Sequence, residues 1–500
     1  MEFLDPQKER LTRIALFVGY GLIALAIGIA SIILLYTTDG YCVDGTGTVD
    51  RCGLVFVSSQ PTGADVSING KLKKSQTNTK FNLQSGTYQF RVSRDGYRDW
   101  QRTITVEGGD VQRFDYPFLF PQALTTTTTT DFTTNIGLAT QSPDRRWLVL
   151  ADENSAGELR LYDLKNPEKP VVTSPTLTTG LLTTSESTNS WKFIEWSNDN
   201  RHVLLQHSYV TGGAAAQEYI LVDRQRIDLS RNLTKDLTLA ATAQLSLFNK
   251  KYDQYYLYDT QARTLQTTAL NGNAPTTTQL TDVTTFKTFG DDTILYVTAT
   301  PPSGTQTEGT VSVVLQQGSR TIVLRELPSD APKYLLDMAQ YAGKWYVVLA
   351  ASNQKGAYIY VDPFDQKLAK TTDLPRPSRF LKVAEPQYVA FSANTQFVLV
   401  QNGQKFGVYD IENDDTYGYT VSAPLDAPQE HATWMDGNRL VYTSGGKMYV
   451  FDYDNINQQT LQANLSGFNS FFSPDYTYVF NIQQQDTAQR LGSTILELKQ

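Results

Sequence analysis

The sequence predicts an all-β protein behind one N-terminal transmembrane helix: a small β-sandwich, then a C-terminal β-propeller of eight blades, with seven blades as the alternative. The composition favours strands, because Tyr and Phe are abundant (28 and 23 of 500 residues) and only 19% of residues are charged. An uncharged apolar run stands near the N-terminus, and a strand and turn pattern repeats along the last three-quarters of the chain.

The apolar run covers residues 14–36. As an α-helix it measures about 34 Å, which exceeds the roughly 30 Å of bilayer hydrocarbon. Lys8, Arg10 and Arg13 precede the run, whereas aspartates follow it before any lysine appears. The positive-inside rule therefore places residues 1–13 in the cytoplasm and all later domains outside the membrane. A cleaved signal peptide is the alternative, but the run exceeds the usual length and no convincing cleavage site follows.

Residues 37–52 form a membrane-proximal loop that holds the two cysteines of the chain, Cys42 and Cys52. In an oxidising compartment we expect a disulfide, which stabilises the fold by at most about 2–3 kcal/mol. A metal or redox pair is the weaker interpretation, because the spacing is not C-x-x-C and no His lies nearby.

Short strands and tight turns alternate through residues 53–118. Asn69-Gly70 is the strongest short hairpin signal. In the following stretch Tyr88, Phe90 and Val92 alternate with polar residues, as in a strand with one buried face. This segment is therefore predicted to be the β-sandwich.

The same segment resembles the PEGA domain, a short β module of surface and envelope proteins. The resemblance rests on Pro61-Thr62-Gly63-Ala64, then Asn69-Gly70-Lys71, then the stretch "LQSGTYQFRVSRDGY". Thr62 departs from the Glu of the family's name. The resemblance covers about one-eighth of the chain and implies a binding or spacing unit with no known catalysis.

Residues 119–134 include six consecutive threonines. We expect a solvated polar linker here, and an extended strand is the alternative.

From residue 135 to residue 500 the chain repeats an apolar run, an S-x-D/N turn, and a strand that ends in an aromatic residue and Asp. The turns Ser142-Pro143-Asp144 and Ser473-Pro474-Asp475 resemble those of the WD40-like blades in TolB-type periplasmic propellers. The Gly-His and Trp-Asp pairs of true WD40 repeats are missing. The resemblance implies the fold and little about a ligand.

Few residues have a catalytic pattern. His202 and His207 are five residues apart and would point to opposite faces of a strand, and His431 is distant, so a shared metal is not expected. Two loosely calcium-like loops, at residues 152–158 and 452–457, lack the required Gly and Glu positions. The aspartates at the ends of the repeat strands are expected to cap turns rather than to form a carboxylate ring: Asp163, Asp223, Asp259, Asp362, Asp410 and Asp452.

We therefore expect no catalytic residue, cofactor or metal site, and a protein that is not an enzyme. The function favoured is a membrane-anchored, extracytoplasmic binding or scaffolding protein of the cell envelope, whose propeller binds another envelope protein or a cell-wall polymer. The net charge of −8 argues against a nucleic-acid partner. A propeller enzyme of glycosidase or lyase type with dispersed carboxylates is the alternative. A transmembrane receptor is a third, weakened by the short cytoplasmic end.

Overall fold

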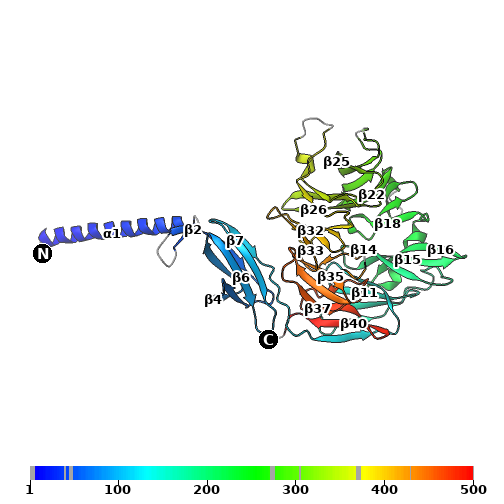
Figure 1. Ribbon diagram of the computed structural model, residues 1–500, viewed down its shortest axis with the longest axis horizontal. Helices are drawn as coiled ribbons and strands as arrows, with labels where there is room; N and C mark the ends of the chain where they lie inside the picture. The colour runs from blue at the N-terminus through cyan, green and yellow to red at the C-terminus, as the bar shows by residue number, and fades with distance from the viewer. Residues whose placement is uncertain are drawn as a thin grey trace, which may run out of the picture. The chain divides into compact units, whose positions relative to one another are not determined.

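The computed structural model describes residues 6–38, 41–43, 49–270, 276–302, 304, 306–367, 373–427 and 430–498. The chain divides into two compact units, Met1–Ala123 and Leu124–Gln500. Outside one long helix the ordered elements are almost all strands, so the all-β prediction is confirmed (Figure 1). Parts of the predicted cytoplasmic end and of the predicted loop, at residues 1–5, 39–40 and 44–48, lie outside the described residues.

Helix α1 (Pro6–Thr38) is 33 residues long and begins before the predicted span. Its stretch Arg13–Ile32 has a mean hydropathy of 2.2, and none of it is buried inside the molecule. A helix of this length and composition suits a membrane span, and an N-terminal signal sequence meets the same criteria.

Two four-stranded sheets make up the rest of the first unit. In one, β2 pairs with β1, β5 and β8; the other has the order β4-β3-β6-β7. Asn69 and Gly70 have φ of 50° and 74° and join β3 to β4, which is the predicted hairpin. The strands are β1 (Tyr41–Val43), β2 (Val49–Val57), β3 (Asp65–Ile68), β4 (Lys71–Gln76), β5 (Thr79–Gln84), β6 (Gly86–Ser93), β7 (Trp100–Val106) and β8 (Val111–Phe114).

In the second unit the described residues form eight four-stranded antiparallel sheets. The first three are β10 (Ile136–Gln141), β11 (Trp147–Asp152), β12 (Leu159–Asp163) and β13 (Val171–Thr173); β14 (Ser190–Trp196), β15 (His202–Thr211), β16 (Ala214–Asp223) and β17 (Arg231–Asn232); and β18 (Ala243–Leu247), β19 (Gln254–Asp259), β20 (Thr264–Ala269) and β21 (Thr277–Leu280). The fourth and fifth are β22 (Val283–Phe289), β23 (Thr293–Thr298), β24 (Thr310–Gln317) and β25 (Arg320–Pro328); and β26 (Tyr334–Tyr341), β27 (Lys344–Ala351), β28 (Ala357–Val361) and β29 (Arg379–Leu381).

The sixth and seventh sheets are β30 (Tyr388–Phe391), β31 (Phe397–Asn402), β32 (Lys405–Asp410) and β33 (Asp415–Thr420); and β34 (Thr433–Trp434), β35 (Arg439–Ser444), β36 (Lys447–Asp452) and β37 (Gln459–Ala463). The eighth joins β38 (Phe471–Phe472), β39 (Tyr478–Gln485) and β40 (Ala488–Ile495) to β9 (Thr126–Asp131). Short helical turns lie between strands at η1 (Ile227–Leu229), α2 (Leu233–Asp236), η2 (Phe248–Lys250) and η3 (Pro363–Asp365).

Each sheet packs on the next along the chain. Buried apolar clusters join the first five sheets in succession and the fifth to the sixth. The rings of Phe406 and Phe451 meet edge to face between the sixth and seventh sheets, and Gln483 Nε2 donates to Ala463 O between the seventh and eighth. A further apolar cluster joins the eighth sheet to the first. In Figure 1 the sheets follow one another in chain order from β11 in cyan to β40 in red.

The threonine run forms strand β9, antiparallel to β40. Thr126 and Thr127 hydrogen-bond through their hydroxyls to Thr494 and Ser493, at 2.7 and 2.9 Å. The expectation of a solvated linker therefore gives way, over these residues, to the alternative of an extended strand. β-branched threonine suits a strand, and the open edge of β40 supplies the backbone partners.

Candidate binding surface

The first strands of neighbouring sheets contact one another: β10 with β14, β14 with β18, β22 with β26, and β26 with β30. The connections from each first strand to its second strand therefore lie where side chains from different sheets can meet. We call these connections the inner turns, and they lie at 142–146, 197–201, 248–253, 290–292, 342–343, 392–396, 435–438 and 473–477.

Three inner turns have the same internal hydrogen bonds. In each, the serine hydroxyl accepts the backbone N–H five residues later, at 3.0 Å: Trp147 N to Ser142, Phe397 N to Ser392, and Tyr478 N to Ser473. The serine in turn donates to the Asp or Asn two residues on. The S-x-D/N pattern is thus a turn that is stabilised by hydrogen bonds from its own polar side chains.

Several inner turns are hydrogen-bonded to the next one. Asp144 N donates to Asn200 Oδ1 at 3.1 Å, and Asn198 N donates to Lys250 O at 2.9 Å. Asn249 Nδ2 then donates to Asp291 Oδ1 at 2.7 Å. The turns of the first four sheets are thereby joined into one continuous polar surface.

Arg145 extends this surface to the last two sheets. Its Nη2 donates to Met435 O at 2.9 Å, and its guanidinium lies 4.1 Å from the ring centre of Tyr476. Burial lowers the pKa of Arg145, and the nearby carboxylate of Asp436 partly offsets this lowering. A single side chain of the first sheet therefore contacts both the seventh and the eighth sheets.

Two carboxylates on first strands bridge neighbouring sheets. Glu195 of β14 accepts a hydrogen bond from the N–H of Leu247 in β18 and forms an ion pair with Lys250. Asp337 of β26 accepts the N–H of Phe391 in β30 at 3.2 Å and lies 3.1 Å from Lys287 Nζ. The side chains of Glu195 and Asp337 remain 12% and 14% exposed. They were not singled out in the sequence, because their partners are about 50 residues away and no local motif marks them.

Five of the six strand-end aspartates end or directly follow the third strand of their sheet, as predicted. Asp259 is the exception, because it ends β19, the second strand of the third sheet. Asp259 still accepts the N–H groups of Gln261 and Ala262, so its role in a turn is the same.

Arginines from inner turns pair with two of these aspartates. Arg146 makes a two-bond contact with Asp163, at 2.6 and 2.8 Å, and Arg201 makes the equivalent contact with Asp223. Hydrogen bonding from Arg146 lowers the pKa of Asp163. These pairs were missed in the sequence, because their members are 17 and 22 residues apart, with the arginine in an inner turn and the aspartate at the end of the third strand.

The two histidines of β15 have separate surroundings. His202 Nδ1 lies 2.6 Å from Asp199 Oδ2, and its ring stacks on Tyr252 at 4.2 Å. His207 Nδ1 lies 2.9 Å from Glu218 Oε1. The structure does not bring these histidines together.

His207 and Glu218 are the centre of a buried polar network, with exposures of 0% and 1%. Glu218 also accepts Thr183 N at 2.9 Å and Asn232 Nδ2 at 2.7 Å, and His207 Nε2 lies 2.9 Å from Asn189 Oδ1. Burial acts to raise the pKa of Glu218, but these hydrogen bonds outweigh it and lower the pKa to about 2. The network ties the segment before β14 to the hairpin β15–β16.

Among the described residues, no group of three or more His, Cys, Asp and Glu is placed to hold a metal ion. In the two loosely calcium-like loops the aspartates contact their own chain. Asp152 accepts Arg160 Nη2 at 2.8 Å, and Asp452 accepts Asn457 Nδ2 at 2.8 Å.

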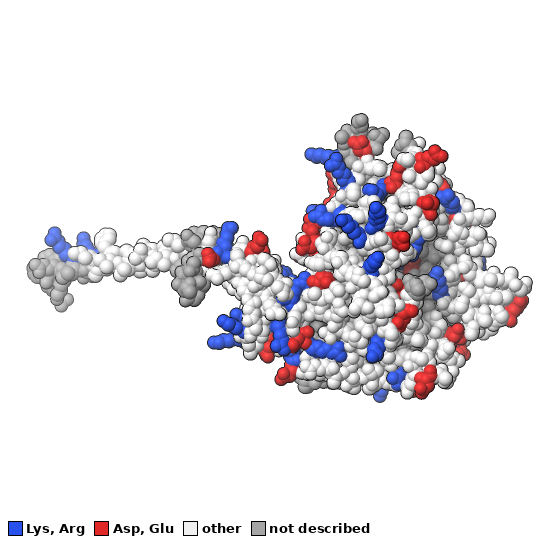
Figure 2. Space-filling view, in the orientation of Figure 1, with Lys and Arg blue, Asp and Glu red and all other residues white. Residues whose placement is uncertain are grey.

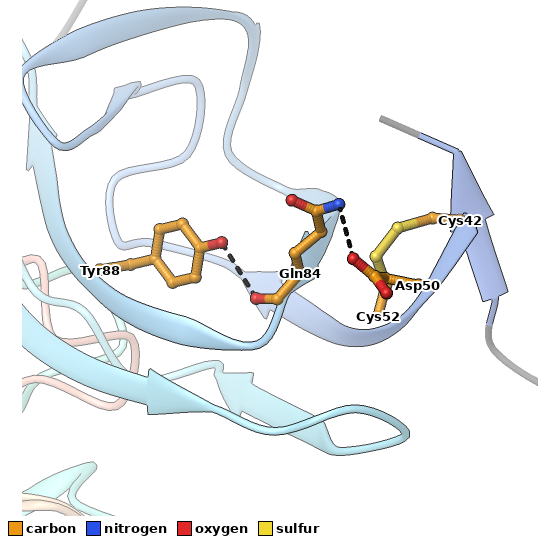
Figure 3. The surroundings of a disulfide bond; sticks show 5 residues. All are labelled: Cys42, Asp50, Cys52, Gln84 and Tyr88. Atoms are coloured by element: carbon orange, nitrogen blue, oxygen red, sulfur yellow. Dashed lines mark hydrogen bonds between the residues drawn. A yellow bond between two sulfur atoms is a disulfide. The ribbon is translucent and has the colours of Figure 1, made fainter. Parts of the chain in front are cut away.

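Cys42 and Cys52 form a disulfide in the structure, between β1 and β2 (Figure 3). Beside it, Gln84 Nε2 lies 3.5 Å from Asp50 Oδ2, and Tyr88 donates its hydroxyl to Gln84 O at 2.9 Å. The disulfide hairpin is thereby connected to β5 and β6 of the sandwich.

The solved structures similar to the chain include the following three, each with a low TM-score. They are a eukaryotic initiation factor (12% identity, TM-score 0.39, 74% of this chain and 90% of that one), Hsv2p of Kluyveromyces lactis (10%, 0.38, 67% and 100%), and an oligogalacturonate lyase in complex with manganese (9%, 0.39, 73% and 97%). No curated protein sequence matches the chain. The model of the PEGA domain matches residues 52–119, so the module expected at 53–118 is identified as a PEGA domain.

Proposed function

We propose that this protein is a membrane-anchored, extracytoplasmic binding protein whose eight sheets are the blades of a closed β-propeller. The observation that carries the proposal is the eighth sheet, in which β40 from the end of the unit pairs with β9 from its beginning. Such pairing suits a closed ring, because one sheet then contains strands from both ends of the unit. The apolar cluster between the eighth and first sheets supports the same arrangement.

The binding platform is the surface formed by the inner turns. Its serines, aspartates and arginines hydrogen-bond within and between turns, which makes a rigid surface that exposes side chains from many sheets. Rigid scaffolds that present many short turns suit protein or polymer recognition. We propose another envelope protein or a cell-wall polymer as the partner.

Helix α1 is the proposed membrane anchor, with the N-terminus inside. Lys8, Arg10 and Arg13 on its N-terminal side are the support for this orientation. Protease added to intact spheroplasts should degrade the propeller unit. A propeller that survives under these conditions, but is cut after the cells are lysed, would refute the orientation.

One observation favours the enzyme alternative enough to test it. Glu195 and Asp337 are carboxylates on the first strands of the second and fifth sheets, and both remain partly exposed. The full chain in nanodiscs should retain an envelope partner in a pull-down and should not turn over polysaccharide substrates. Turnover that Glu195→Gln or Asp337→Asn abolishes, while the exposed Asp228→Asn does not, would establish the enzyme instead.

A further inference from the structure

The PEGA domain has a charge opposite to that of the whole chain. Between residues 53 and 119 there are nine Lys and Arg against six Asp and Glu, although the chain has a net charge of −8. From residue 66 to residue 94, which includes β4, β5, β6 and most of β3, there is no acidic residue at all. Excess positive charge is therefore concentrated on a few strands of this module.

Four lysines of this stretch, Lys71, Lys73 and Lys74 on β4 and Lys80 on β5, form what we call the lysine edge. Three of them are exposed and Lys73 is half-buried. β4 is the terminal strand of its sheet, so one of its sides is open. Figure 2 shows Lys and Arg side chains at this part of the module.

The lysine edge is not neutralised by the rest of the described chain. None of the four lysines forms an ion pair or a side-chain hydrogen bond with a described residue. The arginines of the same stretch are engaged, because Arg91 pairs with Asp99 at 2.6 Å and Arg94 donates to Thr62 O at 2.5 Å. The acidic residue next to β4, Asp65, accepts Gln76 Nε2 at 3.0 Å. Four ammonium groups are thus available to an external anion.

We propose that the lysine edge binds an anionic polymer, one that carries repeated phosphate or carboxylate groups. Lys71, Lys73 and Lys74 lie within four consecutive residues of β4, so their Cα atoms span about 10 Å. Several lysines at such a spacing engage successive charges of a polyanion and release its counterions. This site lies on a different unit from the inner turns and is independent of the propeller's proposed function.

The position of the lysine edge favours a polymer over membrane lipid. Lys80 pairs with Phe56 in the register of β5 and β2, whereas Gln84 pairs with Cys52. The lysine is therefore about 13 Å along β2 from the disulfide hairpin that follows the apolar helix. Thr77, between β4 and β5, bonds to Ser59 beyond the end of β2. Lys80 and the junction between β4 and β5 thus lie toward the end of the module opposite to its connection with the helix.

Binding of labelled inorganic polyphosphate, and separately of labelled polygalacturonate, to the full chain in phosphatidylcholine nanodiscs tests the proposal. Changing all four lysines to Glu should weaken binding of at least one of these polymers by at least about tenfold, and it should reduce the slope of log affinity against log salt by about 3. A Lys→Arg version of the four sites should bind like the natural protein. The matched control changes four exposed propeller lysines, Lys344, Lys355, Lys405 and Lys447, to Glu and should bind nearly normally.

Equal losses in the lysine-edge and control variants would overturn the proposal, since total charge would then explain binding. The proposal would also be overturned if the natural chain bound neither polymer. The same holds if the natural chain bound only to vesicles that contain phosphatidylglycerol. A Lys→Gln version serves if the Glu variant unfolds. Lysines on an edge strand also prevent pairing between sheets, but that role requires no polymer binding and predicts no loss in this measurement.

Discussion

The second and sixth sheets satisfy buried carboxylates in two different ways. In the second, Asp223 is 1% exposed and pairs with Arg201. In the sixth, Asp410 is fully buried and accepts Asn413 Nδ2 at 2.8 Å together with backbone N–H groups, and it makes no ion pair with a described residue. Burial acts to raise the pKa of both groups, but the pKa is lowered for Asp223 and raised for Asp410. The same strand-end position therefore works with or without a cationic partner, with opposite consequences for its response to pH.

Glu218, a second buried carboxylate of the second sheet whose pKa is lowered, gives the largest expected effect. Glu218→Ala should leave His207, Thr183 and Asn232 without their common buried partner. We expect the free energy of unfolding of the second unit to fall by about 3–5 kcal/mol. The measurement is the thermal midpoint followed by near-UV circular dichroism, and an unchanged midpoint would contradict the buried network.

Titration with acid distinguishes the two kinds of carboxylate. The pKa of Glu218 is lowered from 4.5 to about 2, so its contribution to stability is present above pH 4.5 and is lost as the pH falls toward 2. The raised pKa of Asp410 acts in the opposite sense. The contribution of Asp410 to stability is present at low pH and is lost as the pH rises through its pKa in the folded protein. Glu218→Gln should therefore flatten the stability profile between pH 4.5 and 2, and Asp410→Asn should not. Two parallel profiles would refute this assignment.

Adding a cation to the sixth sheet should give Asp410 the kind of partner that Asp223 has in the second sheet. Gln396 occupies the place in its S-x-D/N turn that Arg146 occupies in the first sheet. Gln396→Arg should bring a guanidinium to Asp410 and raise the free energy of unfolding by about 1 kcal/mol at neutral pH. The gain should disappear in a background of Asp410→Asn, as a double-mutant cycle would show. A gain that persists there would place the new contact elsewhere, for example at Glu412.

The smallest effect is expected for an exposed pair of the same residue types. Arg226 and Asp228 lie 2.8 Å apart, with side chains 61% and 60% exposed. Arg226→Gln should leave the thermal midpoint unchanged within error, because solvent screens such pairs. A clear loss of stability would show that exposure is a poor guide to the value of these ion pairs.

The features predicted from the sequence are those whose interactions lie within a few residues. The Asn69-Gly70 hairpin, the serine turns and turn aspartates such as Asp259 depend on backbone conformations or hydrogen bonds within a few residues, so composition and spacing were enough to find them. The bridges made by Glu195 and Asp337 depend on partners in the next sheet, and no periodicity in the chain marks such a partner.

The threonine run shows the same limit at a larger distance. Its strand partner is more than 360 residues away, so the run by itself is typical of a linker. Only the open edge of β40 determines that Thr126–Asp131 is a strand. The arginine partners of Asp163 and Asp223 were overlooked for a related reason, since each pair joins an inner turn to the end of a third strand that the pattern treated separately.

The short connection into β9 has a mechanical consequence. Gln122 N is bonded to Gly96 O in the PEGA domain, and Thr125 O accepts Ile495 N in the propeller unit, so Ala123 and Leu124 alone lie between them. If the helix is held in a membrane and the second unit holds a ligand, tension along the covalent chain runs through these two residues into β9. The hydrogen bonds between β9 and β40, which join the two ends of the propeller unit, would then be the first in that unit to bear the load.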